Sequence, residues 1–173
     1  MFNLRYCNAE DKQQTLEILR QEGSGVCLVA GATNVLPNIQ SRALRDKVLV
    51  NIKQIPELQG IRESEGALIV GAATTIAEIE KSGIVRRNAL ALYQAAGEFA
   101  DPIVRISATI GGNIADASPA SDTSPALLVM EAEVVVESLE RGERRIPMSE
   151  FFLGVRKTAL AADELITAIV IPK

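Results

Sequence analysis

The sequence predicts an α+β fold built from two lobes, and three observations support this. Strand-like and helix-like patterns mix along the 173 residues without the strict strand–helix–strand repeat of a parallel α/β protein. Hydrophobic residues make up 47% of the chain and aromatic residues only 3%, which indicates a core of aliphatic side chains. The length fits one domain or two small lobes. We therefore place a small N-terminal lobe at residues 1–52 and a larger lobe at residues 53–173.

In the small lobe, a helix is predicted to begin at the N-cap Asn8, with acidic residues in its first turn, and to end at Gly23. Two short apolar runs, Val26–Gly31 and Lys47–Ile52, predict buried strands.

In the larger lobe, the run from Ala67 changes from strand to helix, with Thr74 or Thr75 as the N-cap and Glu78 placed for a capping box. An Arg141-Gly142 turn predicts a hairpin. The other expected elements are an alanine-rich helix at 84–100, a buried helix at 124–132 and a last strand at 164–172.

Composition excludes several classes of function. The net charge of −4 argues against nucleic-acid binding, which needs basic patches. The chain has no apolar run near the roughly 18 residues of a membrane span. Its first residues lack the apolar core of a signal peptide, so we expect a cytoplasmic protein.

Reactive side chains are scarce. The absence of histidine excludes an imidazole-based triad and a histidine-ligated zinc, so no catalytic or metal-binding residue is assigned. Two cysteines cannot supply the four ligands of an iron–sulfur cluster, and Cys7 and Cys27 are interpreted as buried structural residues. Any redox chemistry would therefore come from a bound cofactor.

Two segments share one design, in which an apolar stretch leads to glycine, small polar residues and a helix start. They are LVAGATNVL, residues 28–36, and ATIGGNIAD, residues 108–116. Successive N–H groups in such turns form an anion-binding nest, to which the hydroxyls of Thr33 and Thr109 can add hydrogen bonds. Neither segment matches the Rossmann or Walker patterns or contains lysine, so the alternatives are a diphosphate site or two plain turns.

The run ADPIVRISATIGGNIADASPASDTSPALLVMEAEVVV resembles the FAD-binding domain of the molybdenum hydroxylases, the family of xanthine dehydrogenase and carbon monoxide dehydrogenase. LVAGATNVL, IVGAATTIAEI and FFLGVRKTAL with DELITAIVIP are similar to further blocks of that family, in the same order. The resemblance implies a two-lobed FAD-binding fold of the vanillyl-alcohol-oxidase type, with FAD stretched between the lobes.

The resemblance also implies roles for individual residues. The first loop would line the pyrophosphate, with Val35 beside it, and the second loop would contact the diphosphate and ribityl parts of FAD. Asp122 would contact the adenine-ribose part, Phe99 would lie near the flavin ring, and the backbone of Ile166 would contact the isoalloxazine. The loop residues implied are Val29, Ala30, Gly31, Ala32, Thr33, Asn34 and Val35 in the first segment, and Thr109, Gly111, Gly112 and Asn113 in the second.

Some of these assignments have alternatives. Phe99 could be plain core packing, and Asp122 could be the N-cap of the following helix. Arg105 is either a surface charge or a cation that stabilises a reduced, anionic flavin ring. Asp101-Pro102 is interpreted as a turn.

Three positions depart from the family pattern. Ile106 stands where the family usually has asparagine. The first loop has Gly31-Ala32 instead of Gly-Gly, which is tolerable if Ala32 has a negative φ. The chain also stops where the family continues into a C-terminal domain, which predicts either a fragment or a split gene.

The function implied by the resemblance is electron transfer within a multi-subunit oxidoreductase. A molybdopterin subunit would oxidise the substrate, an iron–sulfur subunit would relay electrons, and the FAD of this chain would pass them to NAD+ or another acceptor. The alternatives are a stand-alone FAD reductase or oxidase, a non-catalytic assembly module, and a nucleotide-diphosphate binder unrelated to flavin.

Overall fold

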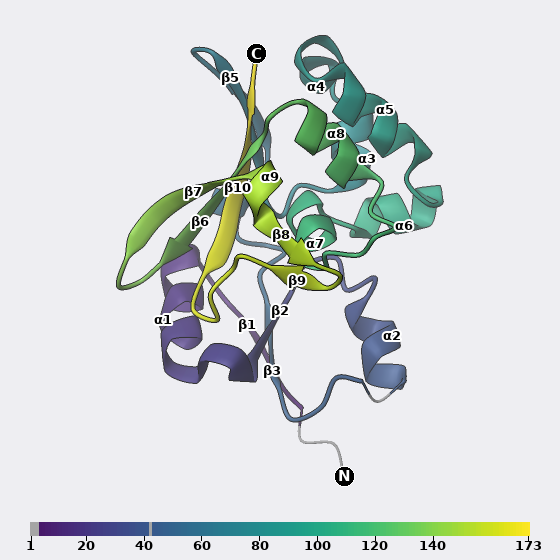
Figure 1. The fold of residues 1–173 in the computed structure, drawn as a ribbon. Coiled ribbons are helices and arrows are strands. Elements are labelled where there is room, and N and C mark those ends of the chain that lie inside the picture. Colours follow the sequence, from purple (N-terminus) through teal and green to yellow (C-terminus); the bar gives the residue numbers. More distant parts are fainter. Residues whose placement is uncertain (1–3, 42) are drawn as a thin grey trace.

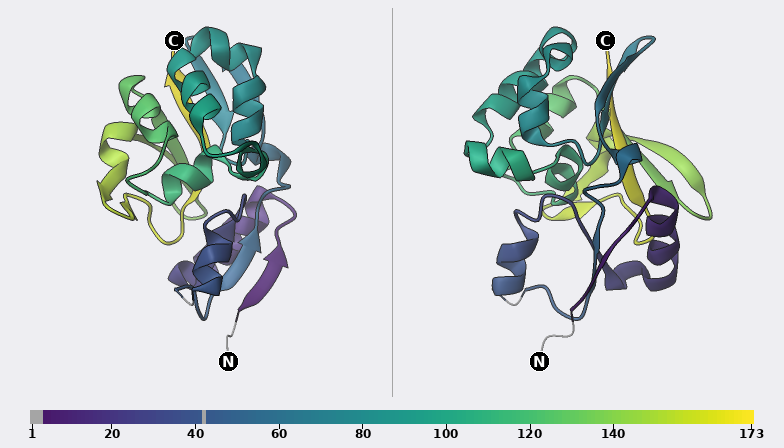
Figure 2. Two further views of the ribbon diagram at one scale, coloured as in Figure 1. Left: turned by 90° about the vertical axis from the view of Figure 1, so that its right-hand side faces the viewer. Right: turned by 180° about the vertical axis from the view of Figure 1, so that it is seen from behind.

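A computed structural model describes residues 4–41 and 43–173, and two separate sheets organise the chain (Figure 1). The smaller sheet is parallel, with the strand order β1-β3-β2. Helices α1 and α2 flank it on opposite sides (Figure 2). The bounds of these elements are β1 (Arg5–Asn8), α1 (Lys12–Glu22), β2 (Val26–Val29), α2 (Val35–Gln40) and β3 (Val48–Asn51).

The larger sheet is antiparallel, with the order β4-β5-β10-β6-β7, so the last strand of the chain lies at its centre. Its helices gather on one side of the sheet (Figure 1). The strands are β4 (Ile61–Ser64), β5 (Ala67–Gly71), β6 (Glu133–Ser138), β7 (Gly142–Pro147) and β10 (Leu165–Pro172). The predicted hairpin around Arg141-Gly142 and the predicted last strand are confirmed.

Seven short helices and a small hairpin complete the larger lobe among the described residues. The helices are α3 (Ile76–Lys81), α4 (Gly83–Asn88), α5 (Leu90–Glu98), α6 (Pro102–Ser107), α7 (Ile110–Ala115), α8 (Thr123–Val129) and α9 (Met148–Phe151), and the hairpin strands are β8 (Phe152–Gly154) and β9 (Lys157–Thr158). Two 3-10 turns, Gly23–Gly25 and Pro56–Leu58, connect other elements. Within these described ranges, no helix is long and apolar enough to cross a membrane.

Each sheet has its own apolar core. The larger core lies between the antiparallel sheet and its helices and includes Phe151, Ile76 and Leu92. The smaller core surrounds the parallel sheet, but it also takes in Leu58 and Leu165 from beyond residue 52. The lobe boundary at residue 52 therefore stays a prediction, and the two lobes share packing where they meet.

Local capping explains several element boundaries. Thr75 is the N-cap of α3, and the capping box with Glu78 is present, as predicted. The first helix, however, is capped by Asp11, whose side chain accepts from the Gln14 N–H, so the prediction of Asn8 is wrong. Asn8 is in β1, and no acidic residue lies in the first turn of α1. Gly23 ends the helix with a φ of 49°.

The helix expected at 84–100 is two helices that break at the buried Ala89. The side chain of Asn88 donates to the Ile84 carbonyl, a local bond of the kind that competes with helix continuation. The helix expected to be buried, α8, is buried on one side only, because Leu127 is buried while Val129 is 81% exposed.

The cysteine prediction also needs correction. Cys7 and Cys27 are both free but half-buried, and they lie on the two outer strands of the small sheet, with β3 between them. Burial raises the pKa of the Cys27 thiol, and nearby Lys47 partly opposes this effect.

Candidate functional site

The first glycine segment forms the turn between β2 and α2. The backbone N–H groups of Gly31, Ala32, Thr33 and Asn34 find no acceptor among residues 4–41 and 43–173. Thr33 and Asn34 are exposed, so these donors lie at the surface. Four successive free N–H groups in one turn fit an anion-binding nest.

Ala32 does not meet the condition of a negative φ under which Gly31-Ala32 would be tolerated without strain. Its φ is 58°, in the left-handed region that favours glycine. A non-glycine residue in this region carries a strain of about 1–3 kcal/mol and persists only where the surroundings hold it. The strained backbone residue, Ala32, is therefore also one of the four residues with a free N–H group.

The second segment uses its backbone N–H groups differently. Ile110 N–H donates to the Thr74 carbonyl (3.0 Å) and Gly111 N–H to the Ala72 carbonyl (2.9 Å). The N–H groups of Gly112 and Asn113 donate to the hydroxyl and the carbonyl of Thr109, which is the N-cap of α7. The expectation of a second backbone nest is therefore wrong. Since α2 and α7 have only six residues each, their helix dipoles add little.

The two segments touch each other through their backbones. A Cβ atom placed on Gly31 would lie 2.3 Å from the Ser107 carbonyl oxygen and 2.9 Å from the Ala108 Cα. Only glycine permits this approach, since real Cβ atoms do not come closer than about 3 Å to backbone. The turn of the small lobe thus lies directly against the start of the second segment, as the paired-segment prediction requires.

Gly111 makes a second close approach. A Cβ at this position would lie 2.7 Å from the Ala72 carbonyl oxygen, which accepts the Gly111 N–H. Ala72 N–H in turn donates to the Thr167 carbonyl at 3.0 Å, at a bulge of β10 next to Ile166. This chain of bonds fixes the second segment relative to the last strand and to the buried Ile166.

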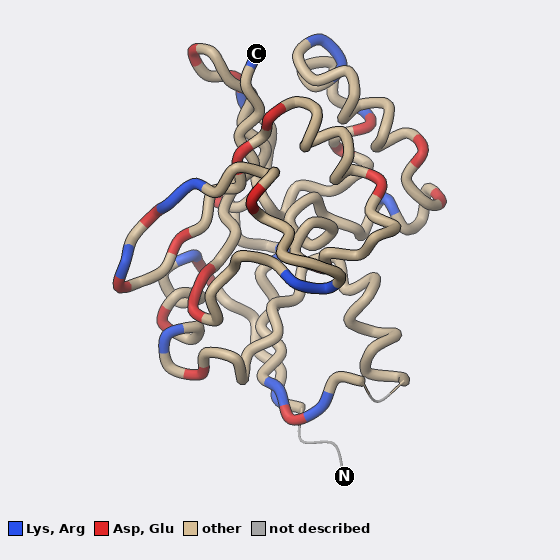
Figure 3. Tube along the Cα trace, in the orientation of Figure 1, with Lys and Arg blue, Asp and Glu red and all other residues tan. Residues whose placement is uncertain are grey.

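Gly112 is less enclosed than Gly111. It is exposed, and a Cβ there would meet only the Thr109 hydroxyl, at 2.9 Å. The segments 28–38 and 106–115 contain no charged residue, and the tube in Figure 3 is uncoloured along both. An anion at this place would be held by N–H, hydroxyl and amide groups without a local cation.

The side chain of Asn113 lies beside Gly112 and is half-buried. Its Oδ1 accepts hydrogen bonds from the hydroxyls of Ser121 and Thr123. The neighbouring Asp122 is exposed and occupies the N-cap position of α8, but its side chain makes no capping hydrogen bond. The N-cap position predicted for Asp122 is confirmed, but its carboxylate makes no capping bond and stays available.

Phe99 and Arg105 lie on either side of the turn that leads into α6. Phe99 is 8% exposed and belongs to the larger core, which agrees with the packing alternative. Arg105 is not a surface charge, because its side chain is 13% exposed and pairs with Glu80 at 2.7 Å. Its guanidinium also donates to the carbonyls of Phe99 and Ala100.

Asp101-Pro102 starts α6 and is not a plain turn. The Asp101 carboxylate accepts from the N–H groups of Ile103 and Val104, and Pro102 occupies the first turn of the helix. Helix α6 ends at Ser107, whose carbonyl lies against Gly31. The Asp101 cap and the Arg105 hydrogen bonds hold α6 and therefore fix this contact.

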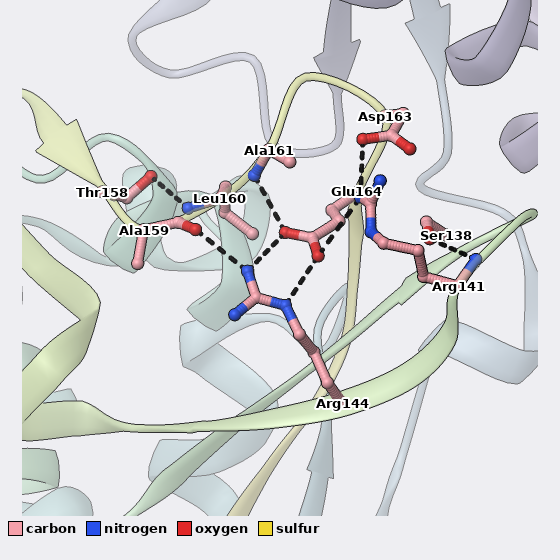
Figure 4. A network of polar contacts seen from close by, with 9 residues as sticks. All are labelled: Ser138, Arg141, Arg144, Thr158, Ala159, Leu160, Ala161, Asp163 and Glu164. Atoms are coloured by element: carbon pink, nitrogen blue, oxygen red, sulfur yellow. Dashed lines mark hydrogen bonds and ion pairs between the residues drawn. The ribbon is translucent and has the colours of Figure 1, made fainter.

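An ion-pair network holds the loop that precedes β10 (Figure 4). The guanidinium of Arg144 contacts both carboxylate oxygens of Glu164, whose side chain is only 2% exposed, and the Ala161 N–H donates to the same carboxylate. Hydrogen bonding to Arg144 lowers the pKa of Glu164 from its ordinary value, although burial acts in the opposite direction. Arg141 likewise lowers the pKa of Asp163.

Sequence reasoning missed the residues that shape the second segment. Ala72 and Thr74 supply its carbonyl acceptors, and Ser107 and Ala108 supply the surface against Gly31. The one signal in the sequence is Gly71, which precedes two alanines and two threonines. A glycine at the end of a strand can indicate that another backbone segment approaches closely. Acceptors from the main chain leave no signature in side-chain identity.

The two lobes and the paired glycine segments together define a cofactor-binding α+β domain. The model for the family described as "FAD binding domain in molybdopterin dehydrogenase" matches residues 2–173. The chain belongs to this family, and the predicted resemblance is confirmed.

Known relatives agree with this assignment. The chain is 36% identical over 149 residues to the nicotinate dehydrogenase FAD-subunit of Eubacterium barkeri, covering 84% of this chain and 50% of the relative. It is 36% identical over 159 residues to the carbon monoxide dehydrogenase medium chain of Hydrogenophaga pseudoflava, covering 92% and 55%.

A solved structure of carbon monoxide dehydrogenase from Hydrogenophaga pseudoflava superposes with a TM-score of 0.94 at 35% identity, over 98% of this chain and 58% of that chain. The predicted two-lobed flavoprotein fold is thereby confirmed. The chain spans about half the length of the curated relatives it matches.

Proposed function

We propose that this chain binds FAD and serves as the flavin-carrying electron-transfer part of a molybdenum hydroxylase. The observation that carries the proposal is the row of four free N–H groups at Gly31–Asn34, which lies against the second glycine segment. A diphosphate supplies the acceptors that these donors lack. The bound flavin would accept and pass on electrons, while the protein positions it.

The proposed contacts follow from the geometry of the two segments. The N–H groups of Gly31 to Asn34 hold the diphosphate, with hydroxyl bonds from Thr33 and Thr109, and Gly112 leaves room for the ligand to approach. The Asn113 amide binds the diphosphate and ribityl region, and the Asp122 carboxylate binds the more distant adenine-ribose part. The remaining residues of the proposed site shape or support it without holding the diphosphate: Val29, Ala30, Val35, Phe99, Arg105, Gly111 and Ile166.

The structure suggests an indirect role for Arg105. Its donors are engaged by Glu80 and two carbonyls, so it fixes the turn that contains Phe99 and does not offer a free charge to the cofactor. The charge-stabilisation role considered from the sequence has less support than this positioning role.

We further propose that electrons reach this chain from an iron–sulfur subunit, that a molybdopterin subunit oxidises the substrate, and that NAD+ or another acceptor takes the electrons. Relatives named as an FAD-subunit and a medium chain support a multi-subunit assembly. A cytoplasmic location is part of the same proposal, and the free thiols of Cys7 and Cys27 fit a reducing compartment.

The first test is direct reconstitution. The purified protein is mixed with FAD and assayed for visible flavin absorbance and for a rise in melting temperature, which linkage requires when the ligand exceeds its Kd. Equal stabilisation by ADP would indicate a nucleotide-diphosphate binder. If FAD gives neither signal, the assembly-module alternative replaces the proposal. Oxidase turnover of the isolated flavoprotein would favour the stand-alone alternative.

Gly112→Val locates the site. The new Cβ atom would lie 2.9 Å from the Thr109 hydroxyl that caps α7, so the threonine side chain must shift, and we expect loss of FAD binding together with a modest loss of stability of the FAD-free protein. The control is Gly97→Val, because Gly97 is also helical but has open space around it, so this variant reports the cost of valine in a helix alone. Normal flavin content in the Gly112 variant would remove the second segment from the site.

A further inference from the structure

A cluster of hydroxyl groups surrounds the Asn113 amide. The hydroxyls of Ser121 and Thr123 lie 2.7 and 2.6 Å from Asn113 Oδ1, and the Ser124 hydroxyl lies 2.6 Å from that of Ser121. Thr123 is fully buried, and Ser121 and Ser124 are 7% and 8% exposed. These hydroxyls come from the loop before α8 and from its first turn, whereas Asn113 belongs to α7.

The protons of this cluster can be assigned by counting donors. Thr123 is fully buried, and the only acceptor that the described residues offer to its hydroxyl is Asn113 Oδ1. If the amide were reversed, its NH2 group would face Thr123 and the buried threonine proton would lose its acceptor, which is unfavourable. The favoured pattern has Ser124 donating to Ser121, and Ser121 and Thr123 both donating to Oδ1.

With Oδ1 held by two donors, the Nδ2 group of Asn113 has both of its hydrogens free. No acceptor for Nδ2 occurs in residues 4–41 and 43–173. Nδ2 belongs to the residue that follows the open Gly112 in α7. The amide is therefore fixed as a hydrogen-bond donor at the edge of the candidate site.

We infer that Ser121 and Thr123 are positioning residues that hold the Asn113 amide with its NH2 group toward an oxygen acceptor of the bound cofactor. This inference rests on the proposed function, since the acceptor belongs to FAD. We assign the acceptor to the diphosphate, because Asn113 belongs to the second segment, whose start contacts Gly31 at the beginning of the row of free N–H groups. The preference of the Asn113 side chain for a hydrogen-bond acceptor then depends on the hydroxyls of Ser121 and Thr123, which do not themselves contact the cofactor.

The test compares FAD affinity with the stability of the FAD-free protein for matched variants. Ser121→Ala combined with Thr123→Val removes both donors and frees the amide to reverse, so we expect the Kd for FAD to rise by roughly ten-fold. Asn113→Asp keeps the acceptor but replaces the NH2 donor by a carboxylate oxygen, so we expect a loss at least as large, with the melting temperature of the FAD-free protein nearly unchanged.

Two controls separate positioning from general destabilisation. Thr123→Ser keeps the hydroxyl but removes a buried methyl group, so it should lower the melting temperature and leave the Kd within about two-fold. Ser124→Ala removes a hydroxyl that does not contact Asn113, so the Kd should again be nearly unchanged. Ser121→Ala alone provides the readout if the double variant does not fold, with an expected rise in Kd of about three-fold.

The outcomes are distinct for the inference and for the proposed function. Failure of the unmodified protein to bind FAD would overturn the proposed function. If the unmodified protein binds FAD and either Asn113→Asp or the two-hydroxyl variant binds it equally well, the positioning inference is wrong. Equal rises in Kd for Thr123→Ser and for the two-hydroxyl variant would also overturn it, because packing would then explain both.

Discussion

The contact between the two glycine segments can be tested by Gly31→Ala. The added methyl carbon would lie 2.3 Å from the Ser107 carbonyl oxygen and 2.9 Å from the Ala108 Cα, and backbone atoms cannot rotate away from it. Gly31 does not have a positive φ, so the cost arises from the contact alone. Overpacking of this kind costs about 1–3 kcal/mol, and a purely backbone contact places the expected cost near the upper value.

The assay is thermal unfolding of the FAD-free protein together with FAD titration. For a chain of this size, a loss of about 3 kcal/mol lowers the melting temperature by roughly 6–12 °C. The segments must also move apart, so we expect weaker FAD binding in addition. Gly97→Ala serves as the control with the opposite sign: with open space around it in a helix, it should stabilise by about 0.5–1 kcal/mol. A Gly31→Ala variant with unchanged stability and unchanged FAD affinity would refute the contact.

Three further predictions concern strain, buried charge and ligand contact. Ala32→Gly should relieve the strain of the positive φ and raise stability by about 0.5 kcal/mol after the entropy cost of glycine, as measured by urea unfolding. Glu164→Gln should cost about 1 kcal/mol at neutral pH, because the buried carboxylate loses its charge-assisted bonds to Arg144, whose half-exposed side chain is partly screened by solvent. Because the folded pKa of Glu164 is lowered, the unmodified protein keeps this contribution above the ordinary glutamate pKa and loses it as the pH falls through the lowered value; unfolding curves of the variant should lack that acid-dependent loss. Asp122→Ala should weaken FAD binding by about 1–3 kcal/mol in a fluorescence titration but leave the melting temperature unchanged, since the carboxylate caps nothing; a stability loss at normal affinity would contradict this.

The sequence was informative where local chemistry decides the structure. The Thr75–Glu78 capping box, the Arg141-Gly142 turn and the apolar run of β10 each depend on residues close together in the chain, and each was predicted. The break at Ala89 was not, because the pattern on both sides is helical and the bond from Asn88 that accompanies the break depends on geometry. Helix periodicity does not report such interruptions.

The candidate site shows the same limit more sharply. The pattern correctly indicated that the segments around Gly31 and Gly112 belong together, since each combines glycine with small polar residues. It could not show that Ala72 and Thr74 accept from the N–H groups of the second segment, because those acceptors are main-chain carbonyls 39 and 36 residues earlier in the sequence than the residues that donate to them. The φ of Ala32 was likewise set by its surroundings and not by its side chain.

The difference between the two segments follows from what each one packs against. The first leaves a strand of the small sheet and has no neighbouring strand beyond Val29 to accept its N–H groups, so they stay free. The second segment packs against the residues after β5. Their carbonyls accept hydrogen bonds from its N–H groups, so these donors are not free. We therefore expect an anion to take its backbone hydrogen bonds from the first segment, and only side-chain hydrogen bonds, from Thr109 and Asn113, from the second. A ligand that satisfies the free donors also offsets the strain at Ala32, which gives the cofactor a structural role in the part of the chain that binds it.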